Sequence, residues 1–472
     1  MVNQGIHVSI ASYNHLPAGG LVSLLGERIR ARRKELGLTQ SQLGGKDLSK
    51  GFISLVETGR TKPSIETLLL LAGRLQKSVG FFLEEDTPLS RKALRIMLAS
   101  GWVAQKRGEF TQAAEIFEQA RVLARQHDEA DEAECYIGLG AALGFLRQFD
   151  LARRNVQRGK ELAEATRNAQ HLVRVNHTLG LIEYFERNFS TARQYFQEGY
   201  RLLREVGHPD LSLAGSFLLN IGYTYAEIGE TEEATRWYQE ALSALEPTQD
   251  LHRIGLAHIE LGAAYRESGH HDSALTQLHR AEHIFELLDS LRLLAQARNS
   301  IGMTLLEQGK TDEALTQLRS SLSIKETIGD DPGRARSLTE IARALIAKGA
   351  FEEAGQALDA AEKLTKKFRD TTEGARITLV RARLHRDSGR LPETVKYYKE
   401  AIDAFDALGM RNDLATACNE LGDVLIRQKR ASEAAPYLAR ALRSLKPFQG
   451  PRYTVPAKAP VSASKDRPRR KP

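Results

Sequence analysis

Two short stretches near the N-terminus carry apolar residues at helical spacing, with a turn between them. Thr39 is a favourable N-cap and Gln42 lies three residues later, which predicts a capping box at the start of the first helix. Ser49 is a second N-cap, before a helix whose apolar side carries Phe52 and Ile53. The pattern therefore predicts two helices joined by a tight turn, with a pair of glycines where the first helix ends.

Further helices are expected on both sides of this pair. Upstream, one face of a predicted helix carries Leu25, Ile29 and Leu36. Its basic residues are expected to be largely exposed: Arg28, Arg32, Arg33 and Lys34. Downstream, the dipeptide Pro63-Ser64 is expected to start another helix, which an apolar segment follows. Four or five helices are therefore predicted within about 65 residues.

From Leu89 onward, small residues return with a period close to 40 residues in nine copies. One small column consists of Ala113, Ala152, Ala192, Ala234, Ala274, Ala314, Ala354, Thr394 and Ala434. A second lies twelve residues before it: Gly101, Gly140, Gly180, Gly222, Gly262, Gly302, Ala342, Ala382 and Gly422. A bulky column lies four residues after the first: Phe117, Val156, Phe196, Tyr238, Leu278, Leu318, Leu358, Tyr398 and Leu438. The small columns predict closely packed helices, and the bulky residues are expected to fill the remaining space.

A turn is expected between the two helices of each copy. Six copies have a glycine there: Gly108, Gly229, Gly269, Gly309, Gly349 and Gly389. Basic residues replace it in three copies: Arg147, Arg187 and Lys429. A single pair cannot bury its apolar face alone, so the nine copies are expected to stack. Only the short segment DTPLS separates the first helices from the repeats, which predicts that they pack on the first copy.

The N-terminal helices resemble the Cro and phage-repressor type of helix-turn-helix domain, the XRE type, from Leu24 to Glu85. The residues that carry the resemblance are Leu38, Thr39, Gln40, Leu43, Ser49, Ile53, Val56, Glu57, Gly59, Pro63 and Ser64. The turn GGKDL is about one residue shorter than the commonest form in this family. The resemblance implies a five-helix domain of the lambda-repressor type whose third helix lies in the major groove of DNA.

The resemblance also implies two sets of DNA contacts. The residues expected at bases are Lys50, Gly51, Ser54 and Leu55. The residues expected at the backbone or at the start of the third helix are Gln40, Ser49, Arg60 and Lys62. Lys50 can donate to guanine and Leu55 can contact a thymine methyl, whereas Gly51 reads no base and Ser54 is permissive. Direct readout is therefore expected to be modest, with dimer spacing and DNA shape adding discrimination.

The repeats resemble tetratricopeptides, most closely in the segment LNIGYTYAEIGETEEATRWYQEAL. HEAT-like repeats have a similar period and are the structural alternative, but the spacing of the small residues favours tetratricopeptides. The predicted fold is all-α, a helix-turn-helix domain followed by a right-handed superhelix of about nine repeats. The expected boundaries are 1–20 for a disordered tail, 21–86 for the DNA-binding domain, 89–445 for the repeats and 446–472 for a disordered basic tail.

In tetratricopeptide proteins the first helix of each repeat lines a concave inner wall, which implies a site for a peptide or protein effector. The implied contact residues are Arg174, His177, Tyr223, Asn299, Arg336, Arg343, Arg376, Arg383 and Asn419. Asparagine can bind an extended peptide backbone, and the four arginines of the last repeats can bind a carboxylate or phosphate. The alternative is that these are solvated residues, some of them paired with Glu340 or Asp387.

The order of the domains resembles that of bacterial regulators that sense small secreted peptides. The first hypothesis is therefore a sequence-specific, DNA-binding transcriptional regulator. Its effector would move the two heads of a homodimer relative to half-sites about one DNA turn apart. The alternative hypothesis is a scaffold that assembles proteins through its repeats, with the helix-turn-helix domain as a docking module.

Other chemistry is not indicated. The densest histidine group consists of His270, His271, His279 and His283, which a turn and an exposed helix face explain without a metal. No nucleotide-binding or catalytic motif occurs, so neither an enzyme nor a cofactor is expected.

Charge and cysteine content refine the picture. The net charge is +7, but the segment from Lys446 onward holds eight Lys or Arg against one Asp, so the excess lies in the C-terminal tail. Contact of this tail with DNA phosphates is the alternative to a solvated tail. Cys135 and Cys418 are the only cysteines, and they lie far apart, which favours a reducing cytoplasm. No apolar run approaches the roughly 18 residues of a membrane span, so no membrane contact is expected.

Overall fold

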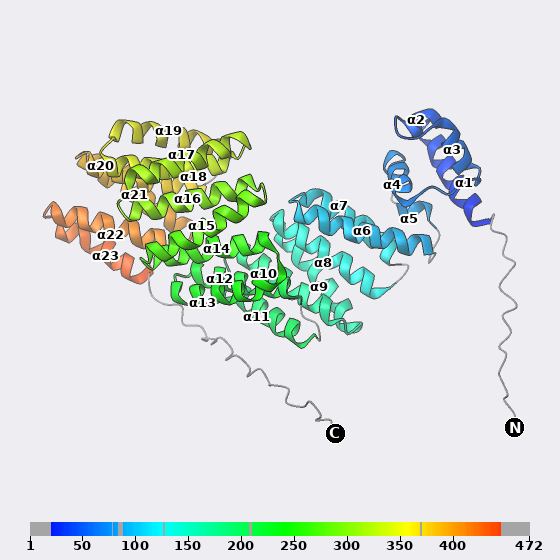
Figure 1. The fold of residues 1–472 in the computed structure, drawn as a ribbon, viewed down its shortest axis with the longest axis horizontal. Coiled ribbons are helices and arrows are strands. Elements are labelled where there is room, and N and C mark those ends of the chain that lie inside the picture. Colours follow the sequence, from blue (N-terminus) through cyan, green and yellow to red (C-terminus); the bar gives the residue numbers. More distant parts are fainter. Residues whose placement is uncertain are drawn as a thin grey trace, which may run out of the picture. The chain divides into compact units, whose positions relative to one another are not determined.

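The fold was analysed in a computed structural model (Figure 1). It describes residues 20–77, 79–83, 88–125, 128–206, 210–368 and 371–444. All regular elements in these ranges are helices, as the sequence predicted. The two expected tails lie outside the described residues, apart from residue 20. The chain divides into two compact units, residues 1–304 and 305–472, which are described separately.

Five helices form the N-terminal part of the first unit, here called the head. They are α1 (Gly20–Glu35), α2 (Gln40–Gly44), α3 (Lys50–Glu57), α4 (Ile65–Arg74) and α5 (Val79–Phe82).

Side-chain caps fix where the central helices of the head begin. The Thr39 hydroxyl accepts from the Gln42 N–H at 3.1 Å, and the Gln42 amide oxygen accepts from the Thr39 N–H at 2.8 Å. The Ser49 hydroxyl accepts from the Phe52 N–H at 3.1 Å. These contacts confirm the predicted capping box and the second N-cap. Each satisfies backbone donors that a helix start leaves without a partner within the helix.

The remaining helices follow one another in the predicted alternation. In the first unit they are α6 (Pro88–Lys106), α7 (Phe110–Ala124), α8 (Glu129–Phe145), α9 (Phe149–Ala165), α10 (Ala169–Phe185), α11 (Phe189–Glu205), α12 (Leu211–Glu227), α13 (Thr231–Leu245), α14 (Leu251–Glu267) and α15 (His271–Leu287). A short 3₁₀ helix, η1 (Glu246–Thr248), follows α13, and α16 (Leu291–Glu307) spans the division. In the second unit they are α17 (Thr311–Thr327), α18 (Asp331–Lys348), α19 (Phe351–Phe368), α20 (Thr371–Asp387), α21 (Leu391–Ala407), α22 (Arg411–Arg427) and α23 (Ala431–Ser444).

Glycines of the second small column meet the bulky column directly. An added Cβ would lie 2.8 Å from Phe117 at Gly101, 2.3 Å from Val156 at Gly140, 2.4 Å from Phe196 at Gly180, 2.4 Å from Tyr238 at Gly222, 2.7 Å from Leu278 at Gly262 and 2.5 Å from Leu438 at Gly422. Real Cβ atoms essentially never come within 3.0 Å of such neighbours. The prediction that the bulky residues fill the space beside the small ones is therefore confirmed in these pairs, and it explains the repeated spacing.

The turns within the repeats also follow the sequence. The six predicted turn glycines adopt a left-handed backbone, with φ between 76° and 82°. The three basic replacements adopt it as well, with φ of 59° at Arg147, 66° at Arg187 and 59° at Lys429. A residue with a Cβ is strained in this region, so three repeats close their turn at an energetic cost that glycine avoids.

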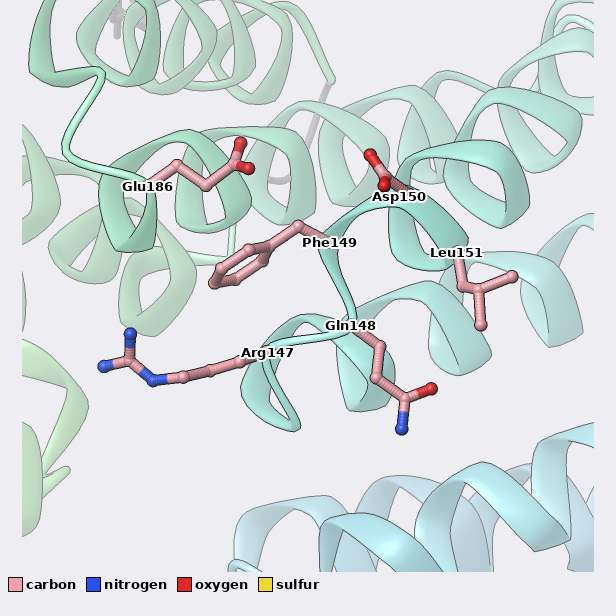
Figure 2. A pocket seen from close by; sticks show the side chains of 6 residues that line it. All are labelled: Arg147, Gln148, Phe149, Asp150, Leu151 and Glu186. Carbon is pink, nitrogen blue, oxygen red and sulfur yellow. The ribbon is translucent and has the colours of Figure 1, made fainter. Parts of the chain in front are cut away.

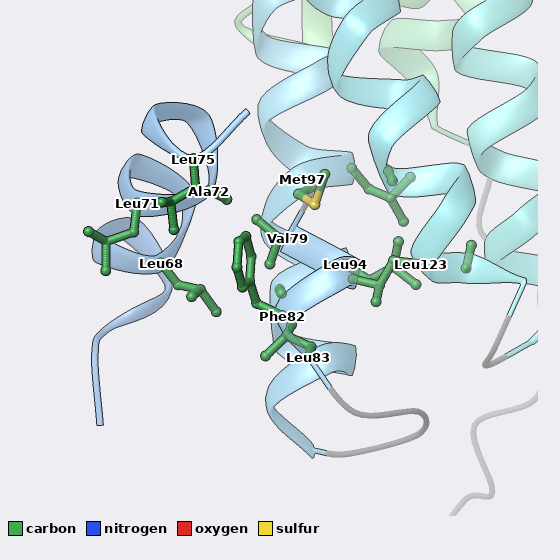
Figure 3. Packing of buried hydrophobic residues seen from close by; sticks show 14 of the residues in the cluster. Leu68, Leu71, Ala72, Leu75, Val79, Phe82, Leu83, Leu94, Met97 and Leu123 are labelled. Carbon is green, nitrogen blue, oxygen red and sulfur yellow. The ribbon is translucent and has the colours of Figure 1, made fainter. Parts of the chain in front are cut away.

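The head packs on the first repeat through one continuous apolar core (Figure 3). Val79 and Phe82 of α5 lie between α4 and α6 and are only 1% exposed. The same cluster contains Leu94 and Met97 of α6 and Leu123 of α7. The predicted packing is confirmed. Burial of a residue such as Phe82 stabilises by roughly 1.5–3 kcal/mol, so the head is held on α6 and α7 by substantial apolar contacts.

Candidate functional site

The outward side of α3 is the first candidate surface. Lys50 and Gly51 at its start are exposed, Ser54 is partly exposed, and Leu55 is 42% exposed. The opposite side, with Ile53 and Val56, is buried. The predicted base-contacting residues therefore share the solvent side of one helix, and none of them belongs to the core.

The predicted backbone-contacting residues flank α3. Arg60 and Lys62 follow the helix and are exposed, and Gly59 turns the chain with φ of 70°. Ser49 precedes α3, and its hydroxyl is occupied by the capping bond to Phe52. These residues place positive charge and helix-start N–H groups beside the exposed side of α3, an arrangement that suits phosphate groups.

A buried ion pair holds α1, α2 and α3 together. Glu57 of α3 accepts from Arg33 Nε at 2.5 Å and from Arg33 Nη2 at 2.9 Å. Gln40 Nε2 donates to the same carboxylate at 2.9 Å, so the Gln40 amide belongs to this network. Its contact with the DNA backbone stays a prediction. Burial raises the pKa of Glu57, but the bonds from Arg33 and Gln40 more than offset this, and the net pKa lies below its ordinary value.

The expected exposure of Arg33 was wrong, because this residue is 9% exposed. Its spacing from Ile29 could have shown this, since residues four apart share a helix face. Glu57 lies four residues after Ile53 in the same way. Arg28 and Arg32 are also partly buried, with bonds of 3.2 Å from Arg28 Nη1 to the Leu83 carbonyl and 3.1 Å from Arg32 Nε to the Leu75 carbonyl.

The second candidate surface is the predicted inner wall, made up of the first helices of the repeats, and it is described for each unit by itself. In the first unit, Arg174 Nη1 lies 3.0 Å from Glu134 Oε1. The Arg174 guanidinium also lies 5.0 Å from the centre of the Trp102 ring. Farther along the chain, Asn299 Nδ2 donates to the Met303 sulfur at 3.5 Å. These contacts hold predicted site residues in defined positions, and they also engage part of their polar groups.

His177 is partly buried and packs against neighbouring side chains. Its ring lies edge-on to Phe217 at 5.1 Å, and its Nε2 is 3.2 Å from Asn220 Nδ2. Burial, with the charge of Arg253, lowers the pKa of His177 to about 4. The ring is therefore neutral near pH 7, where its Nε2 can accept from Asn220.

Tyr223 belongs to a group of tyrosines and carboxylates on α10, α12, α13 and α14. Its ring lies 6.3 Å from Tyr184 and 5.8 Å from Tyr238. Burial, with the charges of Glu267 and Glu227, raises the pKa of Glu260 to about 7, against a hydrogen bond from Tyr223. The sequence analysis predicted Tyr223 as a site residue but missed the acidic, aromatic group around it, because the members of this group lie on different repeats.

The four predicted arginines of the second unit differ in their partners. Arg343 Nη1 lies 2.6 Å from Glu340, and Arg383 forms a two-pronged contact with Glu420 at 2.6 and 2.9 Å. Arg376 Nη2 is 4.0 Å from Asp413, and both Arg376 and Arg336 are exposed, as is Asn419. Arg343 and Arg383 are thus closely paired, and the pair of Arg343 with Glu340 is one that the alternative interpretation expected. Arg376 forms only a long ion pair, and its guanidinium group and that of Arg336 are exposed.

A hollow of about 340 Å³ lies at the turn between α8 and α9 (Figure 2). Its lining residues are Arg147, Gln148, Phe149, Asp150, Leu151 and Glu186. The side chains of Arg147 and Phe149 extend to the same side of this turn. None of the predicted site residues lines the hollow, so it contributes nothing to the two candidate surfaces.

The histidine group shows no metal geometry. His279 Nδ1 lies 3.0 Å from Glu282 on the same helix. Throughout the ranges that the structure describes, no three His, Cys, Asp or Glu residues are arranged to hold a metal ion. Within the same ranges, no helix is both long enough and apolar enough to cross a bilayer.

A capped helix pair with an exposed α3, followed by helix pairs of regular spacing, defines a helix-turn-helix protein that carries helical repeats. Family models agree: a helix-turn-helix model matches residues 29–82. Tetratricopeptide-repeat models match residues 216–246, 293–367 and 375–446. The chain therefore joins an XRE-type helix-turn-helix domain, of the class found in DNA-binding regulators, to tetratricopeptide repeats.

Particular proteins resemble each part. The immunity repressor of Bacillus phage phi105 is 42% identical over 64 residues, which are 13% of this chain and 44% of the repressor. The chain spans less than half the length of the curated relatives it matches. A Rap protein solved in complex with Competence and Sporulation Factor has a TM-score of 0.59 and 16% identity, covering 75% of this chain and 99% of that one. The quorum sensor NprR from B. thuringiensis, in its apo form, has a TM-score of 0.57 and 16% identity with the same coverages.

Proposed function

We propose that this protein is a sequence-specific transcriptional regulator whose repeats bind a peptide or protein effector that controls DNA binding. The observation that carries the proposal is the exposed side of α3, where Lys50, Gly51, Ser54 and Leu55 lie together on a helix that caps and a buried ion pair hold in place.

The surface suits a modest direct readout. Lys50 can donate to guanine O6 and N7, and the exposed Leu55 can contact a thymine methyl. Arg60 and Lys62 supply charge for phosphates beside the groove. Because few side chains read bases, a homodimer that places two α3 helices in half-sites one DNA turn apart would add the required specificity.

The inner wall supports the effector part of the proposal. Arg336 and Arg376 present exposed guanidinium groups at equivalent positions of neighbouring repeats, and Asn419 presents an exposed amide. These groups suit the carboxylates and the backbone of a peptide. Other predicted site residues would have a supporting role within their own unit, because their polar groups are already engaged. They are Arg174, His177, Tyr223 and Asn299 in the first unit and Arg343 and Arg383 in the second. The similar folds include a protein solved with a competence and sporulation factor and a quorum sensor, which is consistent with a signal bound by the repeats.

The shared core of the head and the first repeat offers a route for control. Phe82 of α5 and Leu94 of α6 belong to the same cluster, so a change in the packing of α6 acts directly on the head. A ligand that binds one arrangement of the repeats better than another would shift the population of head positions by that difference in affinity.

A salt titration of DNA binding tests the proposal. The full chain is compared with its Lys50→Ala/Arg60→Ala variant on duplexes that the full chain has selected from a random library. The expected result is a strongly negative dependence of log K on log salt, which becomes shallower by roughly 0.9 for each lost phosphate contact. Weak binding with little salt dependence in the unaltered chain would instead favour the scaffold function, in which the head only docks proteins.

A further inference from the structure

Arg74, in the last turn of α4, reaches across to the turn between α2 and α3. Its Nη1 donates to the Leu43 carbonyl at 3.0 Å and to the Gly44 carbonyl at 2.5 Å. Its Nη2 forms an ion pair with Asp47 within the turn. The guanidinium thus contacts the end of α2 and the turn that leads to α3 at three points. In agreement with these contacts, only 25% of the Arg74 side chain is exposed.

The carbonyls that Arg74 binds lie at the end of α2, and the Gly44 carbonyl also accepts from the Leu48 N–H at 3.1 Å. The last carbonyls of a helix receive no N–H bond from within the helix and carry partial negative charge, so a cation at this end is favourable. This holds for α2, which has only five residues, Gln40–Gly44. A helix of this length has little stability of its own. The Thr39 capping box fixes its start, and Arg74 fixes its end.

Gly45 is matched to this contact. It adopts φ of 58°, which favours glycine. A Cβ at Gly45 would lie 3.0 to 3.2 Å from three atoms of the Arg74 guanidinium group. Glycine therefore serves the backbone of this short turn and also leaves room for the arginine. The turn GGKDL is about one residue shorter than the commonest form in the family that it resembles. Two of its residues, Gly44 and Asp47, contact the Arg74 guanidinium group.

We propose that Arg74 is a positioning residue, which fixes the angle between α2 and α3 and thereby the orientation in which α3 meets DNA. This inference rests on the proposed DNA-binding function. Arg74 acts from outside the core, in contrast to Arg33, whose ion pair with Glu57 is buried. Loss of Arg74 should therefore misplace α3 in a head that is still folded.

Substitution by lysine and methionine in the full chain tests this role. Lysine keeps the charge but lacks the planar guanidinium group that binds two carbonyls and a carboxylate together. Arg74→Lys should therefore reduce DNA specificity as Arg74→Met does. We expect both variants to lower the affinity ratio between the selected duplex and an unselected duplex by about tenfold, the size of one lost base contact. Asp47→Asn should give a smaller loss. Arg236→Met, which removes an exposed arginine of α13, is the matched control and should leave the ratio unchanged.

Hydrogen exchange of the same variants gives a readout that needs no DNA. Amides of α2 and of the following turn should exchange faster in Arg74→Met, whereas amides of α6 and α7 should be unaffected. Equal weakening on both duplexes would show that Arg74 acts only as a charge, and it would overturn the proposal. Unchanged exchange in α2 would overturn it as well. If the unaltered chain bound no DNA, the proposed function would fail, while the exchange result would still decide whether Arg74 fixes the turn.

Discussion

The head and the repeats hold their helices together by different means. In the head, single polar contacts determine where helices lie, above all the Arg33–Glu57 ion pair and the Arg74 contacts to the end of α2. In the repeats, the same apolar contact recurs, a glycine of the first helix against a bulky residue of the second. The head therefore depends on a few residues without substitutes, whereas the repeats distribute their stability over many similar contacts.

The strongest test of this difference is Glu57→Ala. It leaves Arg33 buried without its carboxylate, which typically costs about 3–5 kcal/mol of unfolding free energy. Hydrogen exchange should show loss of protection in α1, α2 and α3 while the repeats beyond α7 stay protected. The control is the double variant Arg33→Met/Glu57→Ala, in which no buried charge remains and much of the stability should return. Equal loss in the single and double variants would contradict this account.

A smaller effect is expected when one repeated contact is overfilled. Gly222→Val adds a side chain where even a Cβ would lie 2.4 Å from Tyr238, and overpacking of this kind costs about 1–3 kcal/mol. Denaturant unfolding followed by circular dichroism would measure it. Gly374→Ala in α20 is the matched control, because nothing lies within 4 Å of its Cβ position. There alanine should stabilise the chain by about 0.5 kcal/mol, since it favours the helix.

Glu260 of α14 is a titratable residue within repeats whose helices are otherwise held together by apolar contacts. The pKa of Glu260 is raised to about 7, so between its ordinary value of 4.5 and pH 7 the folded state binds more protons than the unfolded state. Its contribution to stability is present below pH 4.5 and is lost as the pH rises through 7. Glu260→Gln should therefore flatten the pH dependence in this window and raise stability at pH 8, by on the order of 1–2 kcal/mol.

Unfolding titrations at several pH values would check this prediction. Glu232→Gln, at an exposed position of α13, controls for the lost charge and should leave the shape of the curve unchanged. A Glu260→Gln curve parallel to that of the unaltered chain would show that burial of this carboxyl is not what limits stability.

The smallest effect is expected at the turns. Arg147→Gly relieves the left-handed backbone, with φ of 59°, and should stabilise by roughly 0.5–1 kcal/mol. The reverse change, Gly269→Ala, where φ is 77° and no atom crowds the Cβ position, should destabilise by a similar amount. Thermal unfolding measures both. Opposite signs would confirm that the turns of the repeats obey one backbone rule.

Much of the fold could be predicted from the sequence because the determining contacts recur or are local. The match between Gly180 and Phe196 could be read from columns, and the caps at Thr39 and Ser49 involve residues three apart. Arg33 was placed wrongly because exposure was inferred from residue type and not from its spacing to Ile29.

The candidate sites were harder to predict, because their partners come from distant parts of the chain. The pair of Arg343 with Glu340 is an exception, because the two residues are three apart and the pair was among the alternatives. Arg383 pairs with Glu420, which is 37 residues away in the next repeat, and Arg74 reaches carbonyls about 30 residues earlier. Such contacts depend on how helices are stacked, which no local spacing reveals.

The core that joins α5 to α6 and α7 has a practical consequence. A fragment cut just after Leu83 would lose the surface on which Val79, Phe82 and Leu83 are buried. It would expose these apolar side chains to water and tend to aggregate. A truncation meant to isolate the head should therefore retain α6 and α7. These two helices cover the apolar side of α5 and connect the head to the repeats that follow.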